Sequence, residues 1–190
     1  MEIDKTNSIM KIKSLITAFL VAGVFFSTQA IAQKKEKYDV KKAQKTITEF
    51  KKVDSGLETF FENSFGYAVF PSIGKGAIGI GGAAGKGIVY KQGDMIGGSN
   101  MTQITVGFQL GGQEYSEVIF FEDADSFNRF INNKYQFAAQ VSAVALKSGI
   151  SADASYTDGV AVFSQAKGGL MYEASVGGQK FKFVPENEMK

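Results

Sequence analysis

Residues 66–90 read GYAVFPSIGKGAIGIGGAAGKGIVY, and this glycine-rich stretch decides the fold of the 190-residue chain. Within it, the segments 66–70 and 77–90 mix apolar and small residues at a period of two, which is typical of β-strands. Glycine inside a strand marks a bulge, a sharp bend or a close approach of two backbones. Of the 22 glycines in the chain, 21 lie between Gly56 and Gly178. The sequence therefore predicts a glycine-rich, tightly curved sheet over that region.

Further short strands are expected after this stretch, with one helical interruption. The helix is predicted at 123–133, where one face carries Phe127, Phe130 and Ile131. The other segments with strand-like patterns are 103–112, 116–121, 136–149, 151–156, 159–166, 170–177 and 180–184. So many short antiparallel strands favour a closed or nearly closed sheet. The predicted fold class is α+β: a mainly antiparallel, barrel-like or strongly curved β-sheet with N-terminal amphipathic helices and one internal helix.

The segment before the sheet is basic and has the spacing of amphipathic helices. Lysines crowd residues 34–52, and apolar residues recur there every three or four positions, at Val40, Ala43, Ile47, Phe50 and Val53. The sequence SGLE at 55–58 has the capping-box pattern. It predicts a second helix, whose apolar residues are Leu57, Phe60 and Phe61.

Lys41, Lys42 and Lys45 lie off the apolar stripe of the first helix. One interpretation is an ordinary solvated helix that packs on the domain through its apolar stripe. The sharper interpretation is a basic face that meets anionic lipid headgroups, where each lysine contributes about 1 kcal/mol. The two interpretations are compatible.

The first 32 residues have the layout of a secretory signal peptide. A short basic start at 10–13 precedes an uncharged apolar run at 14–27, and Ala30 and Ala32 follow in the A-x-A pattern of a cleavage site. The apolar run is short for a membrane span, which needs about 20 residues; an uncleaved anchor is the alternative. We expect translation to start at Met10, cleavage near Ala32, and a mature chain without a transmembrane segment.

These patterns give the domain organisation. Residues 1–32 form the signal peptide, 33–65 a basic amphipathic helical segment, and 66–190 a glycine-rich β domain. The last two are expected to fold together as one domain, which suits their combined length. Because of the signal peptide, we expect the protein to be periplasmic or secreted.

The composition excludes several classes of chemistry. The chain has no Cys and no His, so it forms neither a disulfide nor a metal site built on thiolates or imidazoles. A Ser-His-Asp triad and a cysteine nucleophile are excluded for the same reason. The net charge of +2 argues against a dedicated nucleic-acid binder, which carries a clear basic excess. We expect no cofactor and no metal.

Two patterns that resemble nucleotide-binding motifs are by-products of the glycine content. Residues 74–79 spell G-x-G-x-x-G, but a dinucleotide site needs a helix at that turn. The glycines that follow would each cost such a helix about 1 kcal/mol. Residues 81–87, GGAAGKG, resemble a P-loop, but Gly87 stands where Ser or Thr would bind Mg²⁺. Neither pattern is expected to bind a nucleotide.

Three carboxylates in four residues, Glu122, Asp123 and Asp125, form another candidate site. We favour helix capping, because an Asp at a helix start accepts hydrogen bonds from the free N–H groups there. Binding of a hard cation such as Ca²⁺, or acid–base catalysis with a second carboxylate, are the alternatives. No catalytic residue is predicted.

The stretch 66–90 resembles the SYLF lipid-binding domain family, and the resemblance continues through 104–123, 137–156 and 159–178. Eukaryotic members join this domain to SH3 or FYVE modules, bind phosphoinositides and act in actin regulation, whereas bacterial members usually stand alone behind a signal peptide. This chain is similar to the bacterial kind. The resemblance implies a non-enzymatic lipid or membrane binder. Actin binding is not transferred, because an exported bacterial protein does not meet actin in its own cell.

The predicted partner is an anionic, phosphoinositide-like phospholipid membrane surface, with which the exported protein associates peripherally. Lysines supply charge, and backbone N–H groups in glycine turns can cradle phosphate. The residues assigned to lipid binding are Lys41, Lys42, Lys45, Lys75, Lys86, Tyr67 and Phe70. For Lys75 and Lys86, ordinary solvation of a turn is the alternative. The alternative function is a structural or protein-interaction module of the envelope that binds an envelope protein through its glycine-rich sheet.

Overall fold

The computed structural model describes residues 37–78, 80–106, 113–133, 135–136, 142–167, 174–175 and 178–189. Its α-helices are α2 (Val40–Val53), α3 (Leu57–Asn63) and α4 (Ala124–Ile131). Its strands are β1 (Gly66–Ile78), β2 (Ile80–Lys91), β3 (Asp94–Val106), β4 (Gln113–Phe121), β5 (Ser142–Ala145), β6 (Val160–Lys167), β7 (Ala174–Ser175) and β8 (Lys180–Pro185). Two short 3₁₀ helices are η1 (Ile150–Ala152) and η2 (Glu186–Glu188). The α+β class, with one helix inside the run of strands, is confirmed.

The strands form one sheet in the order β7-β5-β6-β4-β1-β2-β3-β8. Its strand pairs are antiparallel except β5 and β6, which run parallel. The sheet is therefore mostly antiparallel, as predicted. Among the described strands, β7 and β8 form two separate edges, so the sheet is open. The closed sheet that the number of strands suggested is not formed by these strands.

Part of the reason is that three of the segments predicted as strands after α4, namely 136–149, 151–156 and 170–177, contribute little to the sheet in their described residues, whereas 159–166 and 180–184 form β6 and β8. The described residues of 136–149 supply β5 and an isolated bridge at Gln136, and those of 170–177 supply β7. The strand predicted at 151–156 is wrong, because η1 and irregular backbone occupy it. There the backbone N–H of Ser151 donates a hydrogen bond of 2.7 Å to Asp54 Oδ2, which ties this segment to the end of α2 instead of to a neighbouring strand.

The glycine-rich stretch folds into a long hairpin, where a single strand was predicted at 77–90. β1 ends at Ile78, β2 begins at Ile80, and the two residues pair in register. β1 continues through Pro71 by a register shift between Val69 and Ile73, the kind of irregularity at which a strand accepts proline. A strand and not a helix follows the G-x-G-x-x-G pattern, as expected.

The next strand also begins before the predicted start at residue 103. Gln92 and Gly93 have positive φ angles of 50° and 90°, which suits a tight two-residue turn between antiparallel strands. β3 therefore starts directly after this turn, at Asp94.

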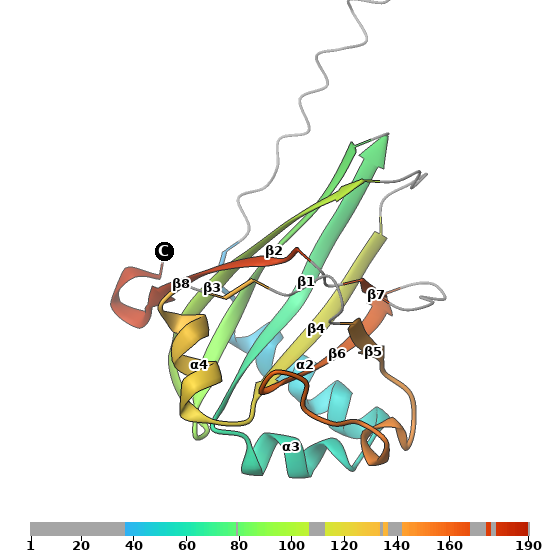
Figure 1. The fold of residues 1–190 in the computed structure, drawn as a ribbon, viewed down its shortest axis with the longest axis vertical. Coiled ribbons are helices and arrows are strands. Elements are labelled where there is room, and N and C mark those ends of the chain that lie inside the picture. The colour runs from blue at the N-terminus through green and yellow to red at the C-terminus, as the bar shows by residue number, and fades with distance from the viewer. Residues whose placement is uncertain are drawn as a thin grey trace, which may run out of the picture. The chain divides into compact units, whose positions relative to one another are not determined.

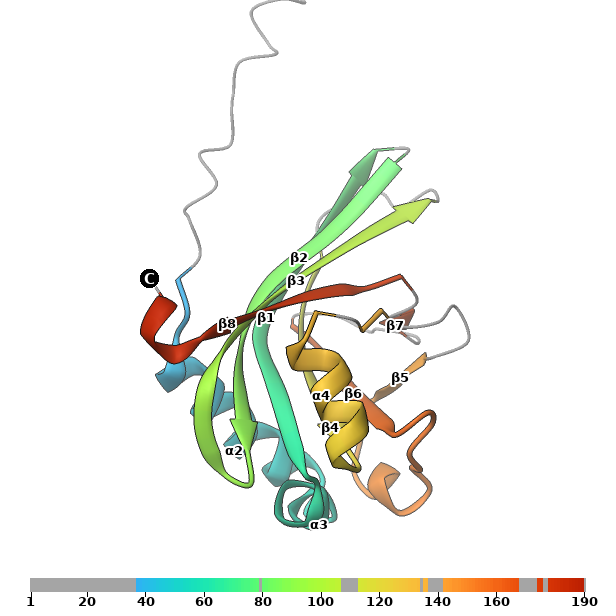
Figure 2. The ribbon, with the colours of Figure 1, turned by 60° about the vertical axis from the view of Figure 1, so that its left-hand side comes forward.

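The sheet is covered on both faces, and we name each face after a helix that packs on it. Helices α2 and α3 cover part of the α2 face, and α4 covers part of the α4 face (Figures 1 and 2). In β4, Val118 and Phe120 belong to the core of the α2 face, whereas Ile119 and Phe121 belong to that of the α4 face. A strand buried on both sides needs a continuous apolar run, which explains the sequence VIFF at 118–121.

Helix α2 forms where the apolar spacing predicted a helix. Asp39 caps its N-terminus by accepting a hydrogen bond of 2.9 Å from the backbone N–H of Lys42. Ala43 and Phe50 are fully buried in the core of the α2 face. Helix α3 is also confirmed, but its predicted capping box is wrong, because Gly56 occupies the N-cap position without a side-chain hydrogen bond.

Candidate functional site

The basic side of α2 points away from the protein. Lys41, Lys42 and Lys45 are exposed, because they lie off the side of the helix that Ala43 buries. Lys45 forms an ion pair of 3.6 Å with Glu49, one helical turn away, and exposed pairs of this kind are weak. The three lysines are thus accessible to an outside partner. None of the described helices is long and apolar enough to span a bilayer.

Lys86 of β2 lies beside the N-terminal end of α2. Its Nζ atom is 4.4 Å from the centre of the Tyr38 ring, where a cation is attracted by the aromatic face. Tyr38 Oη donates a hydrogen bond of 2.9 Å to Asn100 Oδ1 of β3. Partial burial raises the pKa of Tyr38, although the bond to Asn100 opposes the rise. Tyr38 therefore fixes the start of α2 on the sheet and holds Lys86 beside it.

Beyond Tyr38, no described helix covers the α2 face of β2 and β3. Successive rows across these two strands are formed by the pairs Lys86–Asn100, Ala84–Thr102 and Gly82–Ile104. We call positions 82, 84, 102 and 104 the uncovered strip, because all four are exposed. The intervening Ala83 and Met101 point to the α4 face, where they are 4% and 1% exposed. This part of the sheet is therefore buried on one side and open on the other.

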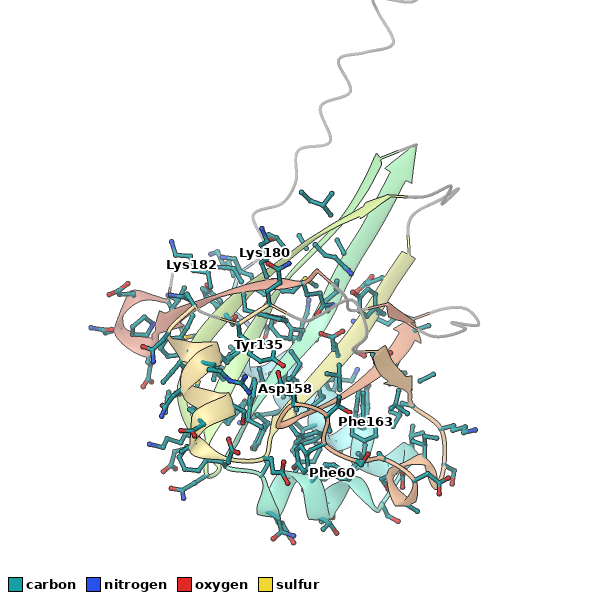
Figure 3. The ribbon with its side chains drawn as sticks, in the orientation of Figure 1. Phe60, Tyr135, Asp158, Phe163, Lys180 and Lys182 are labelled. Atoms are coloured by element: carbon teal, nitrogen blue, oxygen red, sulfur yellow. The ribbon has the colours of Figure 1, made fainter. Side chains whose placement is uncertain are left out.

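Two lysines of the edge strand β8 border the uncovered strip. Lys182 pairs with Asn100 and Lys180 with Thr102, so both side chains lie on the α2 face, as directly paired residues do. Both are exposed, and neither forms an ion pair within the described residues. Figure 3 shows them on β8, at a distance from Phe60 of α3.

A mixed pair borders the α2 face on β4 and β6. Lys167 Nζ lies 3.1 Å from Glu114 Oε1, and Ser72 Oγ donates to the same oxygen over 2.7 Å. The hydrogen bonds from Ser72 and Lys167 lower the pKa of Glu114, and the charge of Lys42 lowers it further. Burial raises this pKa, but by less than the hydrogen bonds lower it. Glu114 is therefore ionised, and its charge is balanced by neighbouring lysines.

Tyr67 and Phe70 do not join the lysines at the surface. Tyr67 is 8% exposed, and its ring stacks on that of Tyr90 with centroids 4.9 Å apart; burial raises the pKa of Tyr67. Phe70 is fully buried on the opposite face, 5.8 Å from the Phe181 ring. The two aromatic side chains serve the two cores of the sheet. The backbone of Lys75 belongs to β1, and its side chain lies outside the described part.

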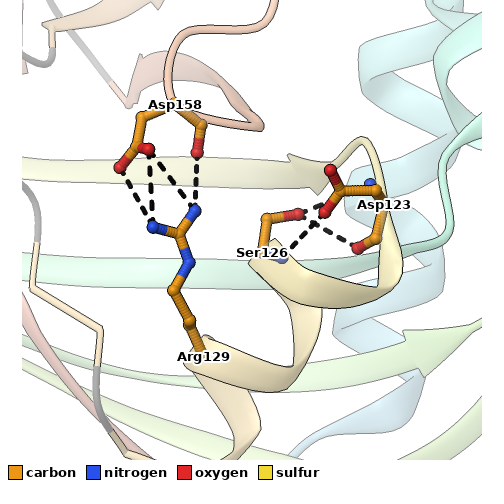
Figure 4. A network of polar contacts seen from close by, with 4 residues as sticks. All are labelled: Asp123, Ser126, Arg129 and Asp158. Atoms are coloured by element: carbon orange, nitrogen blue, oxygen red, sulfur yellow. Dashed lines mark hydrogen bonds and ion pairs between the residues drawn. The ribbon is translucent and has the colours of Figure 1, made fainter.

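The acidic residues before α4 cap that helix. Asp123 accepts a hydrogen bond of 2.8 Å from the backbone N–H of Ser126, and the Ser126 hydroxyl accepts one of 3.4 Å from the backbone N–H of Asp123 (Figure 4). The bonds from Ser126 lower the pKa of Asp123. The capping interpretation is confirmed for Asp123.

A surface hollow of about 660 Å³ lies beside this cap. Arg129 forms part of its wall: Nη2 donates 2.9 Å to the backbone oxygen of Asp158, and Nη1 lies 3.4 Å from Asp158 Oδ1 (Figure 4). No group of three His, Cys, Asp or Glu side chains that could hold a metal ion occurs among the described residues. The hollow is lined by Glu122, Asp123, Asp125, Asn128, Arg129, Asn132, Asp158 and Gly159.

Sequence reasoning missed Glu117, which is fully buried on the α4 face. Gln179 Nε2 donates a hydrogen bond of 3.2 Å to Glu117 Oε2. Burial raises the pKa of Glu117 to about 8, although this bond opposes the rise. The apolar run at 118–121 was the available signal, because a strand buried on both faces also buries the residue that precedes the run.

Two comparisons relate the chain to known proteins. Residues 102–187, from the second half of β3 to η2, match the family model described as Ysc84, Las17-binding protein actin regulator. Over 72 residues the chain is 32% identical to Beta cell expansion factor A of Aeromonas veronii. That match covers 38% of this chain and 28% of the relative, so it spans less than a third of the relative's length. The match over residues 102–187, which is a little less than half of the chain, therefore supports the resemblance of the sequence to the Ysc84 (SYLF) domain family.

Proposed function

We propose that this protein binds anionic phospholipid membrane surfaces and catalyses no reaction. The observation that carries the proposal is the exposed basic side of α2, where Lys41, Lys42 and Lys45 point outward from a helix whose other side is buried. A lysine near an anionic membrane contributes about 1 kcal/mol. Three on one helix therefore support attachment that weakens as salt screens the charges. Lipid binding is also what the resemblance to the SYLF family implies.

Lys86 adds a fourth charge next to the start of this helix. The Tyr38 ring lies beside the Nζ atom of Lys86 and already restricts the rotamers of this side chain. Binding a ligand therefore costs Lys86 less conformational entropy than it costs a free lysine. Lysine acts as a point charge toward phosphate. We therefore take the ligand to be a headgroup with an accessible phosphate, of the phosphoinositide-like kind.

We also propose that the protein is exported, is periplasmic or secreted, and associates with its membrane peripherally. The support is the signal-peptide pattern of residues 10–32, which lies outside the described residues. N-terminal sequencing of the protein from its native source should give a start near Gln33. Recovery of protein that still carries 14–27 would contradict the proposal.

Co-sedimentation with vesicles tests the binding. We expect the protein to pellet with vesicles that contain anionic phospholipid at low salt, to dissociate as salt rises, and to stay in solution with neutral vesicles. Phosphoinositide-containing vesicles should bind more strongly than others at equal surface charge if the headgroup is recognised. Equal, negligible binding to neutral and anionic vesicles would refute the proposal.

Charge reversal locates the site. The variant Lys41/Lys42/Lys45→Glu removes three attractive charges and adds three repulsive ones, so its affinity for anionic vesicles should fall by at least about 100-fold. The control Lys91/Lys147/Lys167→Glu makes the same change in net charge at exposed positions outside α2. If both variants lose affinity equally, net charge and not the α2 lysines governs binding.

The alternative function, a protein-interaction module of the envelope, draws on the uncovered strip of the sheet. The family description also names protein binding. Cross-linking in envelopes distinguishes the two functions. The interaction module would be favoured if a protein were cross-linked at the strip and the chain did not bind vesicles.

A further inference from the structure

We propose that the uncovered strip is the surface that enters the membrane. Ile104 then sits at the boundary between the headgroups and the acyl chains, and a collar of lysines, namely Lys86, Lys180 and Lys182, meets the phosphates above it. This inference rests on the proposed function. It specifies which part of the protein faces the bilayer and how deeply it enters.

The strip lies on an arm of the sheet. β1, β2 and β3 extend well past the helices that cover the rest of the sheet (Figures 1 and 2). The register between β2 and β3 continues along the arm to the pair Ile80–Val106. A projecting arm can meet a flat membrane without a clash from the body of the protein.

Ile104 is 80% exposed, and it is the single exposed large hydrophobic side chain in the described part of the chain. A lone exposed isoleucine is ordinary on a soluble protein, so its position decides its meaning. Around it the strip consists of Gly82, Ala84 and Thr102, and the sequence has no charged residue at 76–85 or 101–113. Lys75 pairs with Ala83, one row nearer the body of the protein than Ile104, so the part of the arm that can be dehydrated without burying a charge begins at the row of Gly82 and Ile104.

The lysines lie at a level that matches a headgroup layer. Lys86 and Lys182 flank Asn100 in one row, about 10 Å apart across two strand spacings. Lys180 lies in the next row, beside Thr102. Ile104 is two residues past Thr102 along β3, so it lies roughly 7 Å from the row of Lys180 and roughly 13 Å from the row of Lys86 and Lys182. Segments that bind at the membrane interface bury their apolar side by a similar depth, about 5–10 Å.

Strand pairing limits how far the arm can enter. β3 pairs with β8 as far as Thr102, and β1 pairs with β4 as far as Lys75. Farther along the arm, from Gly76 of β1 and from Ile104 of β3 onward, no strand pairs with the outer edge within the described residues. Unpaired backbone groups are costly in hydrocarbon. We therefore infer shallow insertion, with the strand edges still among the hydrated headgroups.

A second copy of the chain is a less suitable occupant. Two copies joined through the strip or along β8 would bring Lys180 and Lys182 close to their counterparts, and like charges on an edge strand oppose such pairing. An anionic membrane complements the same charges. The charge pattern therefore favours a lipid surface.

A tryptophan reporter tests the insertion, because the chain has no Trp of its own. Ile104→Trp places the reporter in the strip, and Thr59→Trp places a control on the exposed side of α3. On vesicles that contain anionic phospholipid, Ile104→Trp should shift its emission to the blue. It should be quenched more by lipids labelled near the headgroup than by lipids labelled deep in the acyl chain. The emission of Thr59→Trp should stay that of a water-exposed Trp with and without vesicles.

The outcomes separate this inference from the proposed function. If neither reporter variant pellets with anionic vesicles, the proposed function fails. If both pellet but Ile104→Trp stays in water, binding stands and insertion is refuted. Insertion of Thr59→Trp, or preferential quenching by deep labels, would overturn the orientation or the depth. A blue shift without vesicles that follows a concentration-dependent doubling of mass would identify a second copy as the occupant.

Ile104→Ser adds a second test that needs no reporter. It should lower the vesicle partition coefficient by about tenfold or more at high salt, where charges are screened and burial of an isoleucine side chain dominates. Thr59→Ser is the matched control and should bind as the unchanged protein does. Equal binding by both variants would refute a role for Ile104.

Discussion

Glu117 and Gln179 are joined by a hydrogen bond inside the protein, where Gln179 Nε2 donates to Glu117 Oε2 over 3.2 Å and both residues are fully buried. Glu117 Oε1 and Gln179 Oε1 have no hydrogen-bond partner among the residues that the structure describes. A charged carboxylate is expensive in such a place. Burial therefore raises the pKa of Glu117 to about 8, and the group is mostly protonated at neutral pH.

Replacing Glu117 by Gln should change how stability depends on pH. The unfolded chain loses the Glu117 proton near pH 4.5 and the folded protein near pH 8, so the folded state becomes less stable as pH rises through this window. Glu117→Gln removes that loss. At pH 8 the variant should be more stable by about 1–3 kcal/mol, and at pH 4.5 the two should be similar.

Denaturant unfolding at pH 4.5, 6 and 8 measures this difference. Asp54, whose pKa is lowered, does not interfere, because its contribution is complete above its ordinary pKa of 3.8 and is lost at lower pH. A stability difference between the two proteins that stays constant with pH would contradict the assignment to Glu117.

Asp54 should be important for stability, because it joins two distant segments. Its carboxylate accepts hydrogen bonds from the backbone N–H groups of Ser151 at 2.7 Å and Gly56 at 3.0 Å. Asp54→Ala leaves these donors without a partner and should lower the free energy of unfolding by about 1–3 kcal/mol. Asp54→Asn keeps one acceptor oxygen and should lose less. Equal losses in thermal unfolding would show that charge, and not hydrogen bonding, is what matters.

Two glycines of β1 should respond differently to a methyl group. A Cβ at Gly66 would lie 2.5 Å from Phe127 Cε2 and 2.8 Å from the backbone oxygen of Tyr90, whereas a Cβ at Gly74 would meet nothing within 4 Å. Gly66→Ala should therefore destabilise the protein by about 1–3 kcal/mol, and Gly74→Ala should stay within about 0.5 kcal/mol. A destabilisation by Gly74→Ala as large as that by Gly66→Ala would rule out steric contact as the cause.

Phe163 should be a main support of the contact between α3 and the sheet. It is fully buried, and its ring lies 5.3 Å from Phe60 and 5.9 Å from Phe120 (Figure 3). Phe163→Ala should cost about 3–5 kcal/mol, and Phe163→Leu, which keeps most of the volume, less than half of that. Hydrogen exchange should show faster opening of α3 in the alanine variant. Unchanged exchange in α3 would mean that the helix is held elsewhere.

The elements predicted best from the sequence are those in which apolar residues recur with a regular helical periodicity. The spacing of Ala43 and Phe50 gave α2, and Phe127 and Phe130 gave α4, because each pair is buried against the sheet. The reversal of the chain between Ile78 and Ile80, which pair with each other, was missed. Glycine is compatible with both strands and turns, so the local sequence of a glycine-rich run does not show where the chain reverses direction.

The candidate site was predicted in part, for a similar reason. The α2 lysines are exposed as expected, since a helix shows its polar side through its own period. Tyr67 and Phe70 were assigned to the surface but are buried, because exposure in a strand depends on which layers cover each face. The uncovered strip was not foreseen either, because its existence depends on where α2 begins above the sheet.

The alternation along β3 separates two kinds of evolutionary freedom. Residues 102 and 104 can drift with the composition of the surface they meet, whereas Met101, which is 1% exposed, is constrained by the core. A library randomised at 82, 84, 102 and 104 should therefore retain the fold in most of its members. Selection from such a library on vesicles of different lipids could change the preferred membrane without repair of the interior.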